Sequence, residues 1–476
     1  MEIESFWNNL IKYPKNIALV DTAKNISYTY EELDSDSERF SNHLKLSQKG
    51  LVFLFTKNNY ESVVAYIASL KSDNAVLLLD EKLNNEIRNN LIYAYNPEII
   101  ITLAEIRSQN YKLVYTFFET KVYKNKSSVI NNIYPNLKIL LSTSGTTGSP
   151  KLVRLTDKNI NSNTESIAEY LRIDSNEKAI TTLPLNYSYG FSILNSHLLK
   201  GAAIVLTDET VFFRDFWKLF NTYECSSFAG VPYTYTMLKR TSFENLNLPT
   251  LKMMTQAGGK LSEEFIKHFQ QIADQRGIKF YVMYGQTEAS PRISYVPPER
   301  LKDKVGSIGI PIPGGELMIF DNGKEIKAPN IIGEIVYRGD NVMLGYAENR
   351  ADLQKGDESN GILFTGDLGY KDSDGFFYVT GRMKRFIKLY GLRINLDEVQ
   401  KMIENHFGIS AVCTGKDELL RILIQTDDHT SEVNVKNEVL KFYKLNFKSV
   451  VVKSTNQIPT ASSSKYDFKK INEMFE

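Results

Sequence analysis

Short apolar runs alternate with amphipathic segments along the chain before residue 300, and this alternation limits the folds open to it. The apolar runs are rich in Val, Ile, Leu and Phe, and they lie at Leu51–Phe55, Ala75–Leu79, Ile99–Thr102, Ala179–Leu183 and Ala202–Leu206. Amphipathic segments such as Glu61–Leu70 and Asn159–Tyr170 lie between several of them. Strands that alternate with helices favour an α/β fold with mostly parallel strands.

Composition excludes several classes of protein. The 476 residues suffice for two or more domains, and a formal net charge of +1 gives no reason to expect nucleic-acid or membrane attraction. The two cysteines, Cys225 and Cys413, form no disulfide framework or CxxC pair. The N-terminus lacks the apolar core of a signal peptide, and no apolar run approaches the ~20 residues of a membrane span. We therefore expect a soluble cytoplasmic protein without a membrane span.

The residue composition of the sequence changes after about residue 300. Glycine and proline become frequent between Gly306 and Gly315, and strand-like runs follow at Leu317–Phe320 and Gly333–Tyr337, which predicts a β-rich subdomain. The basic string GRMKRFIKLYG ends that region, and a distinct tail follows. We place the domain boundary there, with domains at residues 1–383 and 384–476.

A loop rich in hydroxyl groups and glycine lies between two apolar runs at residues 140–156. Such a loop offers backbone N–H groups, side-chain hydroxyls and one ammonium to a polyphosphate. Its candidate ligands are Ser144, Gly145, Thr146, Thr147, Gly148 and Lys151. The GxxxxGK[ST] spacing of kinases and GTPases is absent, because Lys151 comes three residues after Gly148. A flexible linker is the alternative, but linkers rarely lie between two apolar runs.

The string STSGTTGSPK resembles the phosphate loop of the adenylate-forming superfamily, which includes acyl-CoA synthetases, adenylation domains of peptide synthetases and firefly luciferase. At least six segments match superfamily motifs in the right order over nearly the whole chain. The resemblance implies a large N-terminal domain of two α/β subdomains plus a β-rich subdomain. A small, mobile α+β C-terminal domain carrying a catalytic lysine would follow.

The resemblance also assigns a nucleotide site. In FYVMYGQTEAS, Tyr284 would stack on adenine, Thr287 would contact phosphate and Glu288 would bind Mg²⁺, which prefers carboxylate and phosphate oxygens. The resemblance implies further contacts from two motifs. QAGGKLS would lie along the adenine and the acyl pocket, and LFTGDLGYKDSDGFFYVTGR would hold the ribose. Their residues are Gly258, Gly259, Lys260, Asp367 and Arg382. A plain turn at the glycines and a surface Asp–Arg pair are the alternatives.

The acid pocket is assigned by position. TTLPLNYSYGFS puts Tyr187 at the family's gating histidine and Ser188 where amino-acid-activating domains keep an amine-binding aspartate. An ordinary α-amino acid is therefore not expected, because a buried amine needs a counter-charge. The pocket residues are Tyr187, Ser188, Ser192, Ala229, Met283, Pro291 and Arg292. Tyr187 and Tyr189 are alternatively core aromatics, and Arg292 binds either a second anionic group of the substrate or a carboxylate of the protein.

The tail carries the remaining motifs. Lys384 matches the family's hinge, and Lys465 matches the lysine that bridges the reacting carboxylate and the α-phosphate, although a solvated lysine is the alternative there. The chain departs from the family pattern before this lysine, with Thr460 in place of a basic residue and Ser464 in place of the glycine. With Thr287 and Glu288, Lys465 completes the implied catalytic set.

The function implied is that of an acid–thiol ligase. ATP and Mg²⁺ would convert a carboxylic acid to an acyl-adenylate with release of pyrophosphate, and the acyl group would pass to CoA. A carrier protein bearing phosphopantetheine is the closest alternative acceptor. We expect it to be a separate protein, because the eleven residues after Lys465 leave no room for a fused carrier domain. An adenylate-forming or ATP-binding protein without thiolation is the second alternative.

Overall fold

The computed structural model describes residues 5–127, 132–142, 151–383, 385–389, 392–416, 418–443, 445–460 and 466–476. The chain divides into two compact units. Unit 1 comprises Met1–Leu317 and Tyr337–Leu363, and unit 2 comprises Met318–Val336 and Phe364–Glu476. The boundary expected at residues 383 and 384 stays a prediction, since residue 384 lies outside the described residues.

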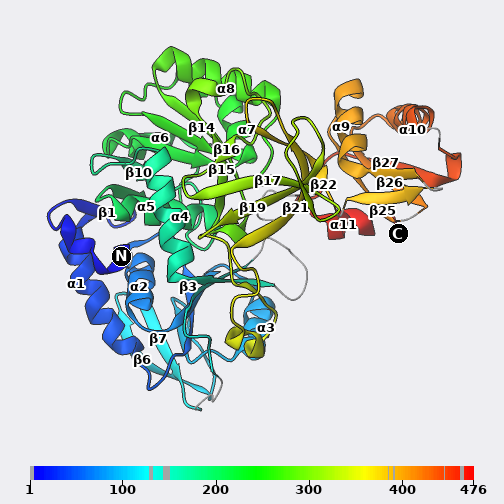
Figure 1. Cartoon of the computed structure of the whole chain (residues 1–476). Helices are drawn as coiled ribbons and strands as arrows, with labels where there is room; N and C mark the ends of the chain where they lie inside the picture. Colours follow the sequence, from blue (N-terminus) through cyan, green and yellow to red (C-terminus); the bar gives the residue numbers. More distant parts are fainter. Residues whose placement is uncertain are drawn as a thin grey trace. The chain divides into compact units, whose positions relative to one another are not determined.

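The first sheet of unit 1 has nine strands, in the order β16-β15-β14-β13-β12-β10-β11-β1-β2 (Figure 1). Their bounds are β1 (Ile17–Asp21), β2 (Ile26–Thr29), β10 (Lys178–Ile180), β11 (Ala203–Leu206), β12 (Ser227–Gly230), β13 (Met253–Gln256), β14 (Lys279–Gly285), β15 (Arg292–Val296) and β16 (Ile310–Pro311). Its central pairs are parallel, whereas β2, β15 and β16 pair antiparallel at the two edges.

The second sheet has eight strands, in the order β20-β9-β8-β4-β3-β5-β7-β6. Their bounds are β3 (Leu51–Thr56), β4 (Ala75–Asp80), β5 (Ile99–Thr102), β6 (Tyr111–Phe117), β7 (Thr120–Asn125), β8 (Leu137–Ser142), β9 (Leu152–Thr156) and β20 (Gly345–Ala347). β8 and β9 are antiparallel neighbours, and they flank the predicted phosphate loop. β20 pairs with β9 and brings residues from much later in the chain to this loop.

Helices cover both faces of each sheet because their apolar stripes need partners. α1 (Tyr30–Ser41), α2 (Tyr60–Lys71), α4 (Asp157–Tyr170) and α5 (Ser188–Leu199) share one core with strands of both sheets (Figure 1). α3 (Asn85–Tyr95) packs on the opposite face of the second sheet. α6 (Arg214–Thr222), α7 (Pro232–Arg240) and α8 (Glu263–Arg276) contribute an aromatic cluster beside the first sheet.

Unit 2 contains most of a five-stranded sheet, with the order β18-β17-β19-β21-β22. The strands are β17 (Gly315–Asp321), β18 (Lys324–Ile326), β19 (Gly333–Gly339), β21 (Ile362–Lys371) and β22 (Phe377–Arg382). The glycine- and proline-rich region is thus β-rich, as predicted.

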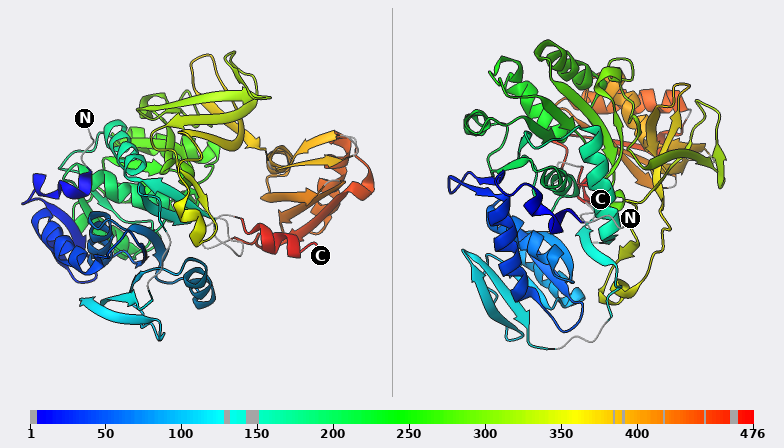
Figure 2. Two further views of the ribbon diagram at one scale, coloured as in Figure 1. Left: turned by 60° about the horizontal axis from the view of Figure 1, so that its bottom comes forward. Right: turned by 60° about the vertical axis from the view of Figure 1, so that its left-hand side comes forward.

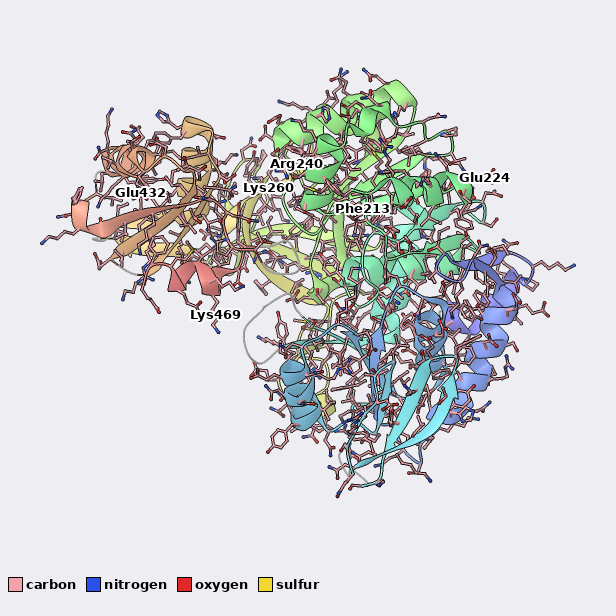
Figure 3. The ribbon with its side chains drawn as sticks, turned by 180° about the vertical axis from the view of Figure 1, so that it is seen from behind. Phe213, Glu224, Arg240, Lys260, Glu432 and Lys469 are labelled. Atoms are coloured by element: carbon pink, nitrogen blue, oxygen red, sulfur yellow. The ribbon has the colours of Figure 1, made fainter. Side chains whose placement is uncertain are left out.

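The C-terminal part of unit 2 holds a two-stranded and a three-stranded sheet, the latter in the order β25-β26-β27. Its elements are β23 (Phe386–Leu389), β24 (Leu392–Asn395), α9 (Leu396–Phe407), β25 (Ala411–Lys416), β26 (Leu419–Gln425), α10 (Thr430–Tyr443), β27 (Val450–Thr455) and α11 (Phe468–Glu473). α9 and α10 pack on one face of the three-stranded sheet and α11 on the other (Figure 2). Figure 3 marks α10 at Glu432 and α11 at Lys469.

The predicted α/β class is confirmed, and most predicted elements lie where they were expected. Thr156 caps α4, because its hydroxyl accepts a hydrogen bond from Asn159 N. The strand expected at residues 179–183 ends earlier, at Ile180, because the chain then turns toward α5. None of the helices in the described part of the chain is long and apolar enough to cross a membrane.

Candidate active site

The structure describes most of the predicted site residues but not all of them. Fourteen lie in unit 1 and two, Asp367 and Arg382, in unit 2. Those of unit 1 are Lys151, Tyr187, Ser188, Ser192, Ala229, Gly258, Gly259, Lys260, Met283, Tyr284, Thr287, Glu288, Pro291 and Arg292. Ser144, Gly145, Thr146, Thr147, Gly148, Lys384 and Lys465 lie outside the described residues, so their roles stay predictions.

Lys151 and Glu288 meet on either side of one tyrosine, Tyr346. The Lys151 ammonium lies 3.7 Å from the centroid of the Tyr346 ring, and the Tyr346 hydroxyl donates to Glu288 Oε1 at 2.9 Å. Burial, with the nearby Glu288 carboxylate, raises the pKa of Tyr346. The hydroxyl therefore stays a donor to Glu288 at neutral pH. The phosphate-loop lysine and the predicted metal ligand are thus parts of one cluster.

Tyr346 is held in this cluster by the strand next to the phosphate loop. β20 pairs with β9, so that Tyr346 lies opposite Val153. Arg154 Nε donates to the Tyr346 carbonyl at 3.1 Å, and the fully buried Arg154 guanidinium is paired with Glu358. The segment that contains Tyr346 carries no motif that predicts a phosphate or metal contact. The strand pairing that brings it to Glu288 has no local signal in the sequence.

Glu288 lies in a tight turn between two antiparallel strands. β14 ends at Gly285, where a Cβ would lie 2.0 Å from the Pro291 carbonyl oxygen, so only glycine fits. Met343 N donates to the Glu288 carbonyl at 2.9 Å, and Asn341 Nδ2 donates to the Ala289 carbonyl at 2.6 Å. These bonds fix the backbone on both sides of the carboxylate.

Thr287 connects this turn to the predicted acid pocket. Its hydroxyl lies 3.1 Å from the Ser188 hydroxyl, at the start of α5. On the other side of Thr287, Gln286 Nε2 donates to the Tyr284 hydroxyl at 3.1 Å. The structure therefore brings together Ser188, Thr287 and the Glu288 turn, as the resemblance implied.

Glycine at residue 258 gives Tyr187 its place in the pocket. Gly258 has φ +80°, and a Cβ there would lie 2.6 Å from the Tyr187 hydroxyl oxygen. The neighbouring tyrosine, Tyr189, is buried, and its hydroxyl lies 2.8 Å from that of Thr255. Further predicted pocket residues, Ser192, Ala229 and Met283, are buried, whereas Lys260, in the turn before α8, is exposed (Figure 3).

Arg292 lies among tyrosines. Its side chain is 2% exposed, and its guanidinium carbon lies 4.0 Å from the centroid of the Tyr189 ring. Burial raises the pKa of Tyr189 to about 12, and the Arg292 charge opposes that rise. The same two effects act in the same directions on Tyr170 and Tyr187. The guanidinium therefore lies against the Tyr189 ring, and its charge lowers the pKa of all three phenols.

Asp367 and Arg382 pair with each other within unit 2. Arg382 Nε donates to Asp367 Oδ1 at 3.0 Å across strands β21 and β22. The Asp367 side chain is nearly buried, whereas that of Arg382 is largely exposed. This is the Asp–Arg pair of the alternative interpretation, and contact of the two residues with a ribose stays a prediction.

No group of three or more His, Cys, Asp or Glu side chains among the described residues forms a metal site. A magnesium ion that accompanies a nucleotide does not need such a group of side chains. Phosphate oxygens and water supply most of its ligands, and one or two carboxylates of the protein suffice. The Glu288 carboxylate, fixed at one oxygen by Tyr346, has the oxygen chemistry that such an ion requires.

The fold and this cluster define an α/β protein with a candidate phosphate and metal site beside the loop between β8 and β9. The chain belongs to the AMP-binding enzyme family, whose model matches residues 6–347. Two relatives are each 31% identical to it: an oxalate–CoA ligase from Arabidopsis thaliana and a long-chain-fatty-acid–CoA ligase from Bacillus subtilis.

The alignments with these relatives cover 57% and 58% of the chain, and the chain spans about half of their length, 53% and 49%. The structure of O-succinylbenzoate coenzyme A synthetase (MenE) from Bacillus subtilis in complex with AMP has a TM-score of 0.76 at 22% identity. That match covers 98% of this chain and 97% of the other, and it shows that the fold is shared.

Proposed function

We propose that the protein activates a carboxylic acid with ATP and transfers the acyl group to the thiol of CoA. In the first step a carboxylate oxygen bonds to the α-phosphorus, the bond to the β-phosphate oxygen breaks, and pyrophosphate leaves. In the second step the thiol sulfur bonds to the acyl carbon, the thiol proton is lost and AMP leaves. No general base is needed for the first step, because the acid is already ionised at pH 7.

One observation carries this proposal: the Lys151–Tyr346–Glu288 cluster beside the loop between β8 and β9. A carboxylate and a polyphosphate repel each other, so catalysis rests on positioning and on neutralising charge. Lys151 would hold the terminal phosphates with residues 144–148. A magnesium ion bound to Glu288 and to phosphate oxygens would supply further positive charge.

The remaining predicted residues complete the proposal. Tyr284, Gly258, Gly259 and Lys260 would contact the adenine side, and Asp367 with Arg382 would hold the ribose. Lys465 would neutralise charge at the reacting phosphorus and would leave the site when the C-terminal domain turns at Lys384. Ser188 argues against an ordinary α-amino acid, because its neutral hydroxyl offers no counter-charge for an amine.

The test is a pyrophosphate-exchange screen across carboxylic acids, repeated with CoA as a thioester assay. Exchange that depends on one class of acid, followed by formation of its CoA thioester, is the expected result. The Lys465→Ala variant should lose adenylate formation and still bind ATP, so unchanged exchange would remove that role.

Two other functions are separated by the same assay. Exchange without CoA thioester, but with acylation of a phosphopantetheine-bearing carrier, would favour a carrier-loading ligase. Exchange without either thioester would favour an adenylate-forming protein of another kind. ATP binding without exchange for any acid would contradict the proposed activation.

The cytoplasm remains the proposed location of the protein. Cys225 and Cys413 are both buried free thiols, as is usual for a protein of a reducing compartment. Cell fractionation with an antibody to the protein tests this, and recovery in a membrane or secreted fraction would contradict it.

A further inference from the structure

Four arginines are buried among the described residues, and three of them are paired with a glutamate. These are Arg88 with Glu81 at 3.2 Å, Arg350 with Glu98 at 2.6 Å, and Arg154 with Glu358. The fourth is Arg292, which is 2% exposed and has no ion pair with any described carboxylate. Its Nε also lacks a hydrogen-bond partner in the described structure.

Contact with an aromatic ring does not explain the difference. Arg88 also lies over a ring, 3.9 Å from the centroid of Phe55, and it nevertheless has a glutamate beside it. Arg292 lies 4.0 Å from the centroid of Tyr189 and has no such partner. A cation–π contact offsets only part of the cost of burying a charge, and a guanidinium stays protonated in proteins.

The surroundings of Arg292 leave its charge uncompensated. The guanidinium lies over the Tyr189 ring, and its charge acts on the phenols of Tyr170, Tyr187 and Tyr189. Burial raises the pKa of all three phenols, so they are neutral at neutral pH and supply no counter-charge. The backbone of Arg292 is fixed by Asn163 and Asn341, which both donate to its carbonyl. The position is thus rigid, buried and positive.

Arg292 is one of the residues that the sequence assigns by position to the acid pocket. Tyr189, under the guanidinium, follows Ser188, and the Ser188 hydroxyl contacts Thr287 next to Glu288. A chain of contacts therefore connects Arg292 to the proposed site of reaction. An acid with its reacting carboxylate at that site would extend toward the guanidinium.

We propose that Arg292 binds a second carboxylate of the substrate, so that the protein activates one end of a dicarboxylic acid. This inference rests on the proposed function and names its substrate class. A guanidinium presents parallel N–H donors that match a carboxylate, and the pair would remove the uncompensated charge.

The test compares the binding of two non-reacting adenylate analogues by the full chain. Both are acyl-sulfamoyl adenosines of equal length, and the acyl group ends in a carboxylate in one and in a methyl group in the other. Several such pairs are compared, with acyl chains of three to six carbons and one aromatic acyl group. For at least one pair we expect the carboxylate form to bind roughly 100-fold more tightly, because an unpaired buried charge is costly. Equal or weaker binding of every carboxylate form overturns the proposal.

Three variants separate recognition from folding. Arg292→Met should lose the preference and bind the methyl form at least as well as the carboxylate form. Arg292→Lys should keep part of the preference and covers the case in which Arg292→Met does not fold. Arg88→Met removes a buried, ring-stacked arginine that has a glutamate partner, and it should keep the full preference.

The measurement does not depend on turnover. If no acid supports pyrophosphate exchange while the carboxylate preference is present, the proposed reaction fails and the Arg292 site stands. If exchange occurs only with monocarboxylic acids, the proposed reaction stands and the Arg292 site fails.

Discussion

Glu288 and Arg292 are four residues apart on the two sides of one turn, and the surroundings of their charges differ. The Glu288 carboxylate is half-buried, receives a hydrogen bond from Tyr346 and has the Lys151 ammonium behind that ring. The Arg292 guanidinium is almost completely buried and faces neutral phenols. At the Glu288 end of the site the charged side chain has partners in the protein. At the Arg292 end the charged side chain lacks an anionic partner.

The difference follows from what each end is proposed to bind. A metal ion and a nucleotide bring their own charges, so the protein has only to hold one carboxylate and one ammonium in place. At the Arg292 end a buried, fixed charge would select between substrates, because an acid without the matching group would leave the guanidinium unpaired. The two ends are therefore expected to respond to different experiments.

The largest effect should come from Glu288→Gln. This change removes the charge of the proposed metal ligand and keeps the shape of the side chain, so we expect exchange to fall about 100- to 1,000-fold with every acid. The relative preference among acids should not change. Titration of exchange against Mg²⁺ measures this, and full activity of the variant would remove Glu288 from the metal site.

Arg292→Met should give the second-largest effect. It should change the preference among acids, whereas Glu288→Gln should lower activity with every acid. We expect kcat/KM for the preferred dicarboxylic acid to fall roughly 100-fold, while that for its monocarboxylic partner stays the same or rises. The dependence on Mg²⁺ should be that of the original protein. Equal losses for both acids would mean that Arg292 only supports the fold.

Tyr346→Phe should have a smaller effect, confined to the Glu288 end. Loss of the hydrogen bond to Glu288 should raise the Mg²⁺ concentration for half-maximal exchange about 10-fold. Tyr95→Phe is the matched control, because the Tyr95 hydroxyl donates at 3.0 Å to the Ala347 carbonyl on the same strand. A similar shift in both variants would show that β20 has moved and that Tyr346 is not a positioning residue.

Tyr189→Phe should have the smallest effect, at the Arg292 end. The ring under the guanidinium is kept, and only the hydroxyl beside Thr255 is lost. We expect a free energy of unfolding lower by about 1 kcal/mol and an acid preference within about twofold of the original. Thermal unfolding and the same pair of acids measure this. Loss of the preference would mean that the hydroxyl, too, binds the substrate.

The sequence predicted the α/β class and many element bounds, because strand and helix patterns are local. It also predicted that Thr287, Glu288 and Ser188 share a site, since each lies in a motif of the family. The role of Tyr346 was not predictable, because it depends on the pairing of β20 with β9, whose residues are far apart in the chain. The state of Arg292 was not predictable either, because only the packed structure shows which carboxylates are absent from its surroundings.

The most direct measurement is a crystal structure of the protein with the adenylate analogue that carries a distal carboxylate. The account predicts that this carboxylate lies about 2.7–2.9 Å from the Arg292 guanidinium nitrogens and that Tyr189 remains stacked on the guanidinium. A structure in which the distal carboxylate lies elsewhere, or in which Arg292 is paired with a carboxylate of the protein, would contradict it.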